Sequence, residues 1–242
     1  MLLVVFVICV SIVLYARSDF SSRPIKQKPV EKLQRPENPF PGVIFLEDVA
    51  KQLSCHYEHQ CDLDIIKNIN KIMLFNGATN GQISIHSRLY GEKGKTSWSI
   101  FEYVFRWTNL PPHITEGRKA DIPIERSVCL IENEQVFFPR FIIEPETFNL
   151  EKMYEDIDID ENPMFSKLYF LKSPEAENIK SFFKKEFLDY LVANKGLAIE
   201  AYENSLFIYY PKHVLDLKDI PEFYEKCFEI YNLLNAPSGK LN

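Results

Sequence analysis

Two adjacent runs of alternating side chains constrain the fold most strongly. Apolar and polar residues alternate over 82–89 and again over 98–107. A period of two is typical of β-strands, because successive side chains point to opposite faces of a sheet. The short Gly-containing turn between the runs predicts an antiparallel hairpin, with Ile83, Ile85 and Leu89 on one face. The second run is apolar on nearly both faces, which favours a central strand or one that a helix covers.

The rest of the folded region combines further strands with helices. Short apolar runs between turn formers predict strands over 127–131, 141–143, 167–172, 197–201 and 206–210. Apolar residues that recur every three or four positions predict helices over 43–59, from the Ser173 cap to Lys195, and over 221–234, with a second short helix or turn over 62–73. Consecutive hairpins with separate helices predict an α+β fold, in which an antiparallel sheet has helices on one face.

The start of the chain is apolar throughout. Met1–Ala16 carries no charge, proline or glycine. The run is slightly shorter than the usual minimum of about 17 residues for a membrane-spanning helix, a mismatch that bilayer thinning and snorkelling of flanking residues absorb at modest cost. A cleaved signal would show a positive n-region before the apolar run and a small-residue cleavage site after it. Here only Met1 precedes the run, and Ala16-Arg17-Ser18 is not a convincing cleavage site. We therefore expect residues 1–17 to be retained as a transmembrane helix rather than cleaved.

Positive charges follow the apolar run, and none precedes it. The first of them are Arg17, Arg23, Lys26, Lys28, Lys32 and Arg35. Lys and Arg are enriched on the cytoplasmic side of membrane segments. We therefore expect a single-pass membrane protein with a cytoplasmic C-terminal domain. The alternative is that these cations only solvate a linker.

The chain after the anchor divides into a linker and a folded region. Residues 18–42 are basic and rich in proline, and such segments are extended rather than folded. Residues 43–236 are long enough for a single α+β domain, with a division into two subdomains near 148–160 as the alternative. Hydrophobic residues make up 46% of the chain and aromatic residues 14%, which favours a folded core over disorder.

Charge and cysteine content limit the partners and the compartment. The net charge is −6, and without a clustered basic surface we expect no nucleic-acid partner. The cysteines are odd in number and irregularly spaced, which favours a reducing compartment over a disulfide scaffold. No glycine-rich nucleotide-binding motif occurs in the sequence, and we expect no cofactor.

Cys55, His56, His59 and Cys61 form the most suggestive cluster. Thiols and imidazoles are zinc ligands, and in a helix Cys55 and His59 would share one face at positions i and i+4. Ligands packed so closely in sequence rarely close a tetrahedron, and no second pair of ligands follows. Cys55, His59 and Cys61 are therefore metal candidates, with the C-terminus of a helix as the alternative interpretation.

Asp156, Asp158 and Asp160 resemble the start of a calcium-binding loop. That loop needs Gly at its sixth position and Glu at its twelfth, where this chain has Glu161 and Lys167. An EF-hand is therefore excluded. Alternating carboxylates of this kind are usually a solvated face.

Several short motifs follow one another at specific spacings over about 75–210. They are Leu74-Phe75-x-Gly77, Tyr90-Gly91, Ile100-Phe101-Glu102-Tyr103-x-Phe105, Ser127-Val128-Cys129-Leu130, Phe138-Pro139-x-Phe141-x-x-x-Pro145-Glu146 and Asp158-Ile159-Asp160-x-Asn162-Pro163-x-Phe165-Ser166-x-x-Tyr169-x-Leu171. Together they resemble an uncharacterised family of bacterial membrane-anchored proteins of unknown function. The resemblance implies an architectural role for the motif residues, which are mostly aromatic residues, prolines and turn formers. Where this chain has Glu102, the family more often has Asp.

An anchor, a basic linker and a folded domain without a recognised catalytic motif predict a function in binding. We expect a membrane-anchored cytoplasmic domain that acts as a non-enzymatic interaction or scaffolding module, with a protein partner or the lipid surface as its target. A metal-dependent hydrolase that uses one of the two clusters above is the alternative from the enzyme class. A small-ligand pocket over the aromatic strand, at Trp98, Tyr103 and Trp107, is the third.

Overall fold

The computed structural model describes the greater part of the folded region. The described residues are 41–60, 81–107, 124–146, 156–211 and 214–235. The chain divides into two compact units, Met1–Asn38 and Pro39–Asn242, and all the described residues belong to the second. The predicted transmembrane helix lies outside them. None of the described helices is long and apolar enough to cross a membrane.

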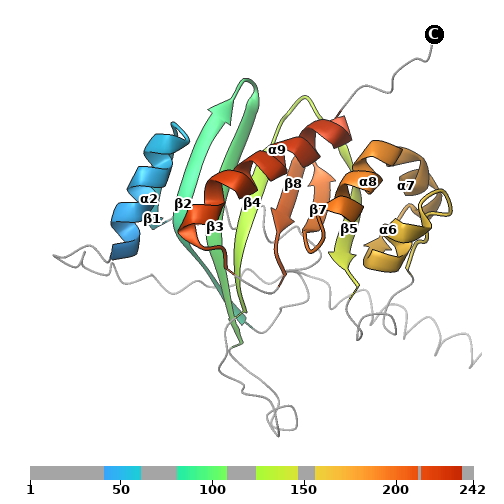
Figure 1. The fold of residues 1–242 in the computed structure, drawn as a ribbon, viewed down its shortest axis with the longest axis horizontal. Helices are drawn as coiled ribbons and strands as arrows, with labels where there is room; N and C mark the ends of the chain where they lie inside the picture. The colour runs from blue at the N-terminus through green and yellow to red at the C-terminus, as the bar shows by residue number, and fades with distance from the viewer. Residues whose placement is uncertain (1–40, 61–80, 108–123, 147–155, 212–213, 236–242) are drawn as a thin grey trace, which may run out of the picture. The chain divides into compact units, whose positions relative to one another are not determined.

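The described strands form one antiparallel sheet in the order β1-β2-β3-β4-β8-β7-β5-β6 (Figure 1). The strands are β1 (His56–Gln60), β2 (Gly81–Lys93), β3 (Thr96–Trp107), β4 (Ile124–Glu132), β5 (Phe138–Pro145), β6 (Tyr169–Lys172), β7 (Ala198–Glu203) and β8 (Ser205–Tyr209). The antiparallel sheet with accompanying helices confirms the predicted α+β class. Because β4 pairs with β8, segments on both sides of residues 148–160 contribute to the same sheet.

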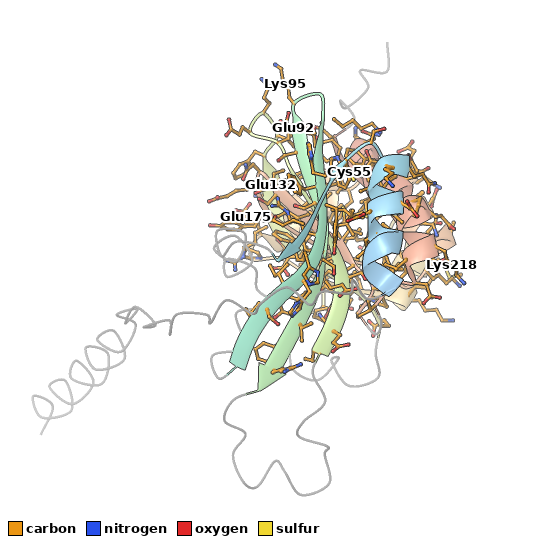
Figure 2. The ribbon with its side chains drawn as sticks, turned by 90° about the vertical axis from the view of Figure 1, so that its left-hand side faces the viewer. Cys55, Glu92, Lys95, Glu132, Glu175 and Lys218 are labelled. Carbon is orange, nitrogen blue, oxygen red and sulfur yellow. The ribbon has the colours of Figure 1, made fainter. Side chains whose placement is uncertain are left out.

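The described α-helices pack on one face of the sheet (Figures 1 and 2). They are α2 (Pro41–Gln52), α6 (Pro163–Leu168), α7 (Ala176–Phe182), α8 (Lys185–Ala193) and α9 (Ile220–Asn235), with a short 3₁₀-helix η1 (Leu217–Asp219) before α9. Each α-helix contributes buried apolar side chains to the larger core. The sheet side of that core includes Ile100, Cys129 and Ile208, which are directly paired across neighbouring strands and therefore share a face.

A second apolar cluster lies on the opposite face, and strand residues alone form it. Its buried members are Ile85, Phe101, Tyr103, Phe105, Val128, Leu130, Ala198, Phe207 and Tyr209. Phe101 follows Ile100 in β3, so the pleat sends the two side chains to opposite faces. The strand over 98–107 is therefore apolar on both faces and central, with β2 and β4 as neighbours, as its composition predicts.

A β-bulge in β2 changes the face that some side chains occupy. Pairing with β3 is regular up to His86 and resumes at Leu89, with one residue more on β2 than on β3. Ser87 absorbs the extra residue in a left-handed conformation, with φ at 53°. Ile85 therefore belongs to the second cluster, whereas Leu89 belongs to the helix-covered core. The prediction of one shared face was wrong, because strict alternation contains no bulge.

The helix predicted over 43–59 is shorter than expected. α2 ends at Gln52, and Ser54, with φ at 52°, turns the chain into β1. Tyr57 packs against the helix-covered core from the strand. In the sequence, Tyr57 is spaced from the apolar residues of α2 as if it continued the same helix face. This spacing is a coincidence, because a turn and a short strand bring Tyr57 back to the same core.

Two predicted elements further along the chain are also divided. The helix expected from Ser173 to Lys195 is broken at Phe183, whose backbone is extended, and forms α7 and α8. Ser173 is not its N-cap, because α7 begins only at Ala176 with Glu175 in the N-cap position. The Ser173 hydroxyl accepts from the Glu175 N–H and donates to the Arg140 carbonyl at 2.8 Å. The strand expected over 167–172 starts only after α6.

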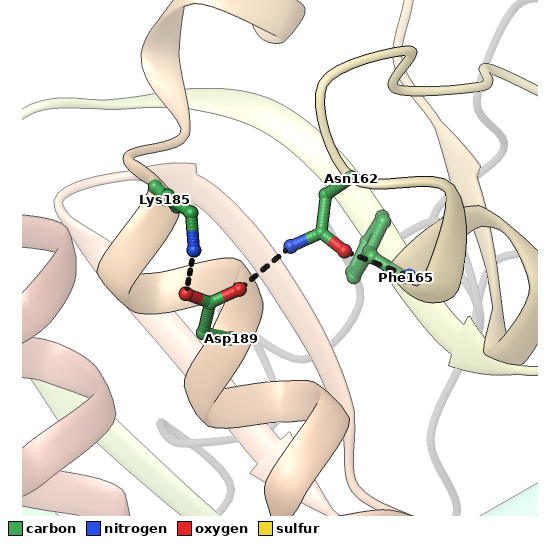
Figure 3. A network of polar contacts seen from close by, with 4 residues as sticks. All are labelled: Asn162, Phe165, Lys185 and Asp189. Carbon is green, nitrogen blue, oxygen red and sulfur yellow. Dashed lines mark hydrogen bonds and ion pairs between the residues drawn. The ribbon is translucent and has the colours of Figure 1, made fainter.

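The motif around Asn162 connects two helices (Figure 3). The Asn162 side-chain oxygen accepts the Phe165 N–H at 3.1 Å and caps α6, with Pro163 in its first turn. The Asn162 amide also donates to Asp189 of α8 at 3.0 Å, and Asp189 forms an ion pair with Lys185. These contacts give the motif an architectural role.

Candidate binding groove

Two of the predicted metal ligands, Cys55 and His59, lie within the described residues. Cys55 lies between α2 and β1, and burial raises the pKa of its thiol, whereas metals bind the thiolate. His59 lies on β1 with its Nδ1 3.3 Å from the Tyr57 hydroxyl oxygen. Because β1 is a strand, the helical i, i+4 geometry expected for Cys55 and His59 was wrong. Cys61 lies outside the described residues, among which no group of three or more metal-ligating side chains occurs.

The acidic residues Asp156, Asp158 and Asp160 alternate with buried isoleucines. The Asp156 carboxylate accepts the Leu171 N–H at 2.9 Å and ties this segment to β6. Asp158 and Asp160 are exposed. The pattern therefore reflects an extended segment with one side against the core and the other in solvent.

The aromatic pocket expected over the sheet does not form as predicted. Trp98 packs in the helix-covered core, whereas Tyr103 belongs to the cluster on the opposite face. One pocket therefore cannot contain both rings. The side chain of Trp107 lies outside the described residues.

Glu102 is half-buried on the helix-covered face of β3, directly opposite His86 on β2. Burial, followed by the nearby Glu125 carboxylate, raises the pKa of Glu102. Burial, followed by His59 and then Arg106, lowers the pKa of His86. Both shifts favour the neutral form of the side chain. Glu102 therefore faces His86 within the sheet rather than pointing freely outward.

A groove follows one end of the sheet. Its β1 half lies on the side away from the helices, and its β7 end reaches Val136, which packs against the helix-covered core. It consists of three adjoining concavities of about 560, 460 and 400 Å³. The first and second share Glu92 and Glu132, and the second and third share Glu134 and Asn204. We call these three concavities the binding groove. Figure 2 shows Glu92 and Glu132 on the opposite side of the sheet from α2.

Arg88 lies at the β1 end of the binding groove. Its guanidinium stacks on the Tyr90 ring, 4.4 Å from the centroid. One amino group lies 3.6 Å from a Glu58 carboxylate oxygen, and another donates to the Ser99 hydroxyl at 3.4 Å. Both distances are long for hydrogen bonds. The Arg88 Nε is buried without a hydrogen-bond partner, so much of the donor capacity of Arg88 is unused.

The groove wall beside Arg88 is held by close packing. A Cβ atom at Gly91 would lie 3.3 Å from the Trp98 indole, so Gly91 allows the two strands to keep this contact. Trp98 in turn packs edge-on against Tyr224 of α9, with ring centroids 4.7 Å apart. The His56 ring covers Tyr90 at 5.3 Å between centroids.

Hydrogen bonds fix the centre of the groove. The Asn133 amide donates to the Thr96 hydroxyl at 3.0 Å and to the Tyr231 hydroxyl at 2.8 Å. This network joins the β2–β3 hairpin, the turn after β4 and helix α9. Glu132 lies beside it on the opposite face, where it accepts a long 3.5 Å hydrogen bond from Ser205. The carboxylate is therefore held on a rigid part of the sheet.

The far end of the groove combines acidic and apolar side chains. It is lined by Glu134, Val136, Phe137 and Glu203, together with residues of the two adjacent turns. Phe137 is 76% exposed, which is unusual for a large apolar side chain. Glu203 holds the β7–β8 turn in a left-handed conformation, with φ at 54°. Phe137 therefore offers an apolar contact at a shallow, open end of the groove.

The sequence prediction did not identify Arg88, Glu92 or Glu132 as site residues. One signal was present: Ser87 interrupts the apolar positions of the first alternating run, and a polar residue at such a position can mark a bulge. The carboxylates carried no comparable signal. Glu92 and Glu132 lie close together only because the β2–β3 hairpin and the turn after β4 are at the same end of the sheet.

A buried ionisable cluster lies further along the same face as the groove. The Tyr209 hydroxyl donates to Glu144 at 3.4 Å, and the Arg126 guanidinium lies 5.2 Å from the Tyr209 ring centroid. Burial raises the pKa of Glu144, an effect that Arg126 and Tyr209 partly offset. Burial is also the largest cause of the raised pKa of Tyr209. The groups link β4, β8 and β5 through the sheet.

Comparison with known proteins supports the fold. No protein-family model and no curated protein matches the chain. The crystal structure of the mycobacterial trehalose monomycolate transport factor A, TtfA, is similar, with a TM-score of 0.53 at 12% sequence identity. The match covers 79% of this chain and 93% of that one. At this identity the similarity shows a shared α+β fold and nothing about function.

Proposed function

We propose that this protein is a non-enzymatic binding module, anchored in a membrane through residues 1–17, with its folded domain in the cytoplasm. The binding groove carries the proposal. Its polar groups are distributed along a groove rather than converging on one reacting atom, which suits recognition of a ligand with several contact points. The similar solved structure is named a transport factor, and a binding role is compatible with that name.

The local structure of the groove supports a role in recognition. A β-bulge places Arg88 there with a donor left unpaired, and bulges are common where a side chain is redirected toward a functional site. At the other end Phe137 offers an exposed aromatic contact. Cation and aromatic residues of this kind are frequent among the side chains that dominate protein interfaces.

A photo-crosslinking experiment tests the binding role. A photoreactive amino acid replaces Glu132 in the groove or, as the control, Glu175, an exposed carboxylate next to α7. We expect irradiated cells to give a discrete adduct of the full-length chain from position 132 and none from position 175. Equal adduct patterns at the two positions, or none at either, would contradict the proposal.

Cell fractionation tests the anchor. The apolar run and the cations that follow it support residues 1–17 as a membrane segment. We expect the full-length chain in the membrane fraction after a high-salt wash, and a chain that lacks residues 1–17 in the soluble fraction. A full-length chain that stays soluble would show that the anchor assignment is wrong.

A further inference from the structure

We propose that the binding groove takes an extended, positively charged peptide segment of a protein partner, with the peptide's apolar side chain at the Phe137 end. This inference rests on the proposed binding function and specifies the chemistry of the ligand. Length, charge and the two unlike ends of the groove support it.

The length of the groove favours an extended chain. Its lining residues run from His56 on β1 to Glu203 on β7, and five strand-to-strand steps separate these strands in the sheet. At about 4.8 Å per step the groove spans about 24 Å. A peptide that advances about 3.3 Å per residue would fill this distance with about seven residues.

The charges of the groove favour a cationic ligand. Its lining contains the carboxylates of Glu92, Glu132, Glu134 and Glu203, against the cations Arg88 and Lys95. The carboxylates occupy the middle and the β7 end. A peptide with basic side chains over this part would gain complementary charge, and an acidic peptide would face repulsion.

Arg88 gives the β1 end a different chemistry. Its side chain is 23% exposed. The Nε is buried, so a ligand would meet the two amino groups, whose contacts with Glu58 and Ser99 are long. A peptide carbonyl or C-terminal carboxylate at this end would accept from the guanidinium. At the opposite end, Val136 and Phe137 offer apolar contact. These unlike ends give the bound peptide one preferred direction.

Fluorescence anisotropy with a synthetic peptide tests this inference. The probe is a labelled heptapeptide with Lys at alternate positions, Ser between them and Leu at its N-terminus. Its matched partner has Glu in place of each Lys. The protein is the full-length chain in nanodiscs of neutral lipid, so that the bilayer itself does not attract the charged probe. We expect the Lys peptide to bind at least about tenfold more tightly than the Glu peptide.

Variants locate the binding. We expect the E132Q/E134Q double variant and the F137A variant each to weaken binding of the Lys peptide by about tenfold or more, and E175Q to leave it unchanged. Thermal unfolding of each variant checks that the fold is intact. Replacing the N-terminal Leu of the probe by Ser should weaken binding to the parent chain but not to F137A.

Equal binding of the Lys and Glu peptides, or equal losses in E132Q/E134Q and E175Q, would overturn this inference. The same holds if the crosslinking experiment gives a protein adduct from position 132 while neither peptide binds. In that case the proposed binding function stands and the peptide chemistry is wrong. If position 132 gives no adduct and neither peptide binds, both proposals fail.

Discussion

Arg88 owes its place in the groove to the backbone of the residue before it. Ser87 adopts a left-handed conformation, which is uncommon for any residue other than glycine. The resulting bulge returns Leu89 to the helix-covered core while Arg88 stacks on Tyr90. A strained residue beside an incompletely paired cation is the feature of this chain most indicative of function.

Replacing Ser87 by glycine should stabilise the domain. The left-handed conformation costs an ordinary residue about 1–2 kcal/mol, and glycine avoids this cost. Glycine also has more conformational freedom in the unfolded chain, which reduces the gain by about 0.5–1 kcal/mol. We expect S87G to raise the free energy of unfolding by up to about 1 kcal/mol in urea denaturation, and S87A to give no gain. A loss of stability in S87G would show that the bulge does not require this conformation.

The Glu144 carboxyl should make stability depend on pH. Its pKa is raised in the folded state by burial, so its contribution to stability is fully present below the pKa of the unfolded chain, about 4.3. That contribution is lost as the pH rises through the higher folded pKa. We expect E144Q to lose less stability than the parent between pH 4 and pH 8, because an amide does not ionise in this range. Its oxygen can still accept from Tyr209, so the hydrogen bond is kept. Parallel curves would contradict this assignment.

At the scale of elements, a side-chain cap sets the start of α6, whereas α7 and α8 begin without one. α6 is only a short helix, and short helices depend on caps and packing rather than on intrinsic propensity. Asn162 caps α6 and also contacts α8, so one side chain sets the start of one helix and the position of another (Figure 3).

Removal of this cap should cost more than removal of the neighbouring ion pair. We expect N162A to lower the free energy of unfolding by about 1–2 kcal/mol, because a buried N–H of α6 loses its acceptor. The matched variant K185Q removes the cation that pairs with Asp189 at an exposed site and should change stability little. Urea denaturation of the full-length chain in detergent checks both, and equal losses would contradict the role of the cap.

The elements show what local pattern can and cannot predict. The β2–β3 hairpin and α9 follow from strong periodicity, because the side chains of α9 repeat against one core and those of β3 alternate between two apolar clusters. The bulge at Ser87 and the break at Phe183 do not, since each arises where packing overrides a continuous pattern. The binding groove could not be predicted for a related reason. Its residues come from separate strand ends, and only the order of strands in the sheet brings them together.

At the scale of the whole molecule, we propose a membrane segment followed by a domain with a recognition groove. The anchor and its orientation are proposals from the first 35 residues, and the groove is a feature of the described domain. The two parts make separate predictions about where the protein lies and what it binds. The prediction that the domain lies in the cytoplasm is the more basic of the two, because the compartment decides which partners the groove can meet.

Protease protection in spheroplasts of a Gram-negative host that expresses the chain tests that central claim most directly. The full-length chain carries a C-terminal epitope, and protease is added before or after permeabilisation of the inner membrane. A cytoplasmic domain predicts that the epitope survives in intact spheroplasts and is lost only on permeabilisation, whereas a periplasmic control protein is digested in both. Loss of the epitope from intact spheroplasts, with a cytoplasmic control protein still protected, would place the domain outside and contradict the account.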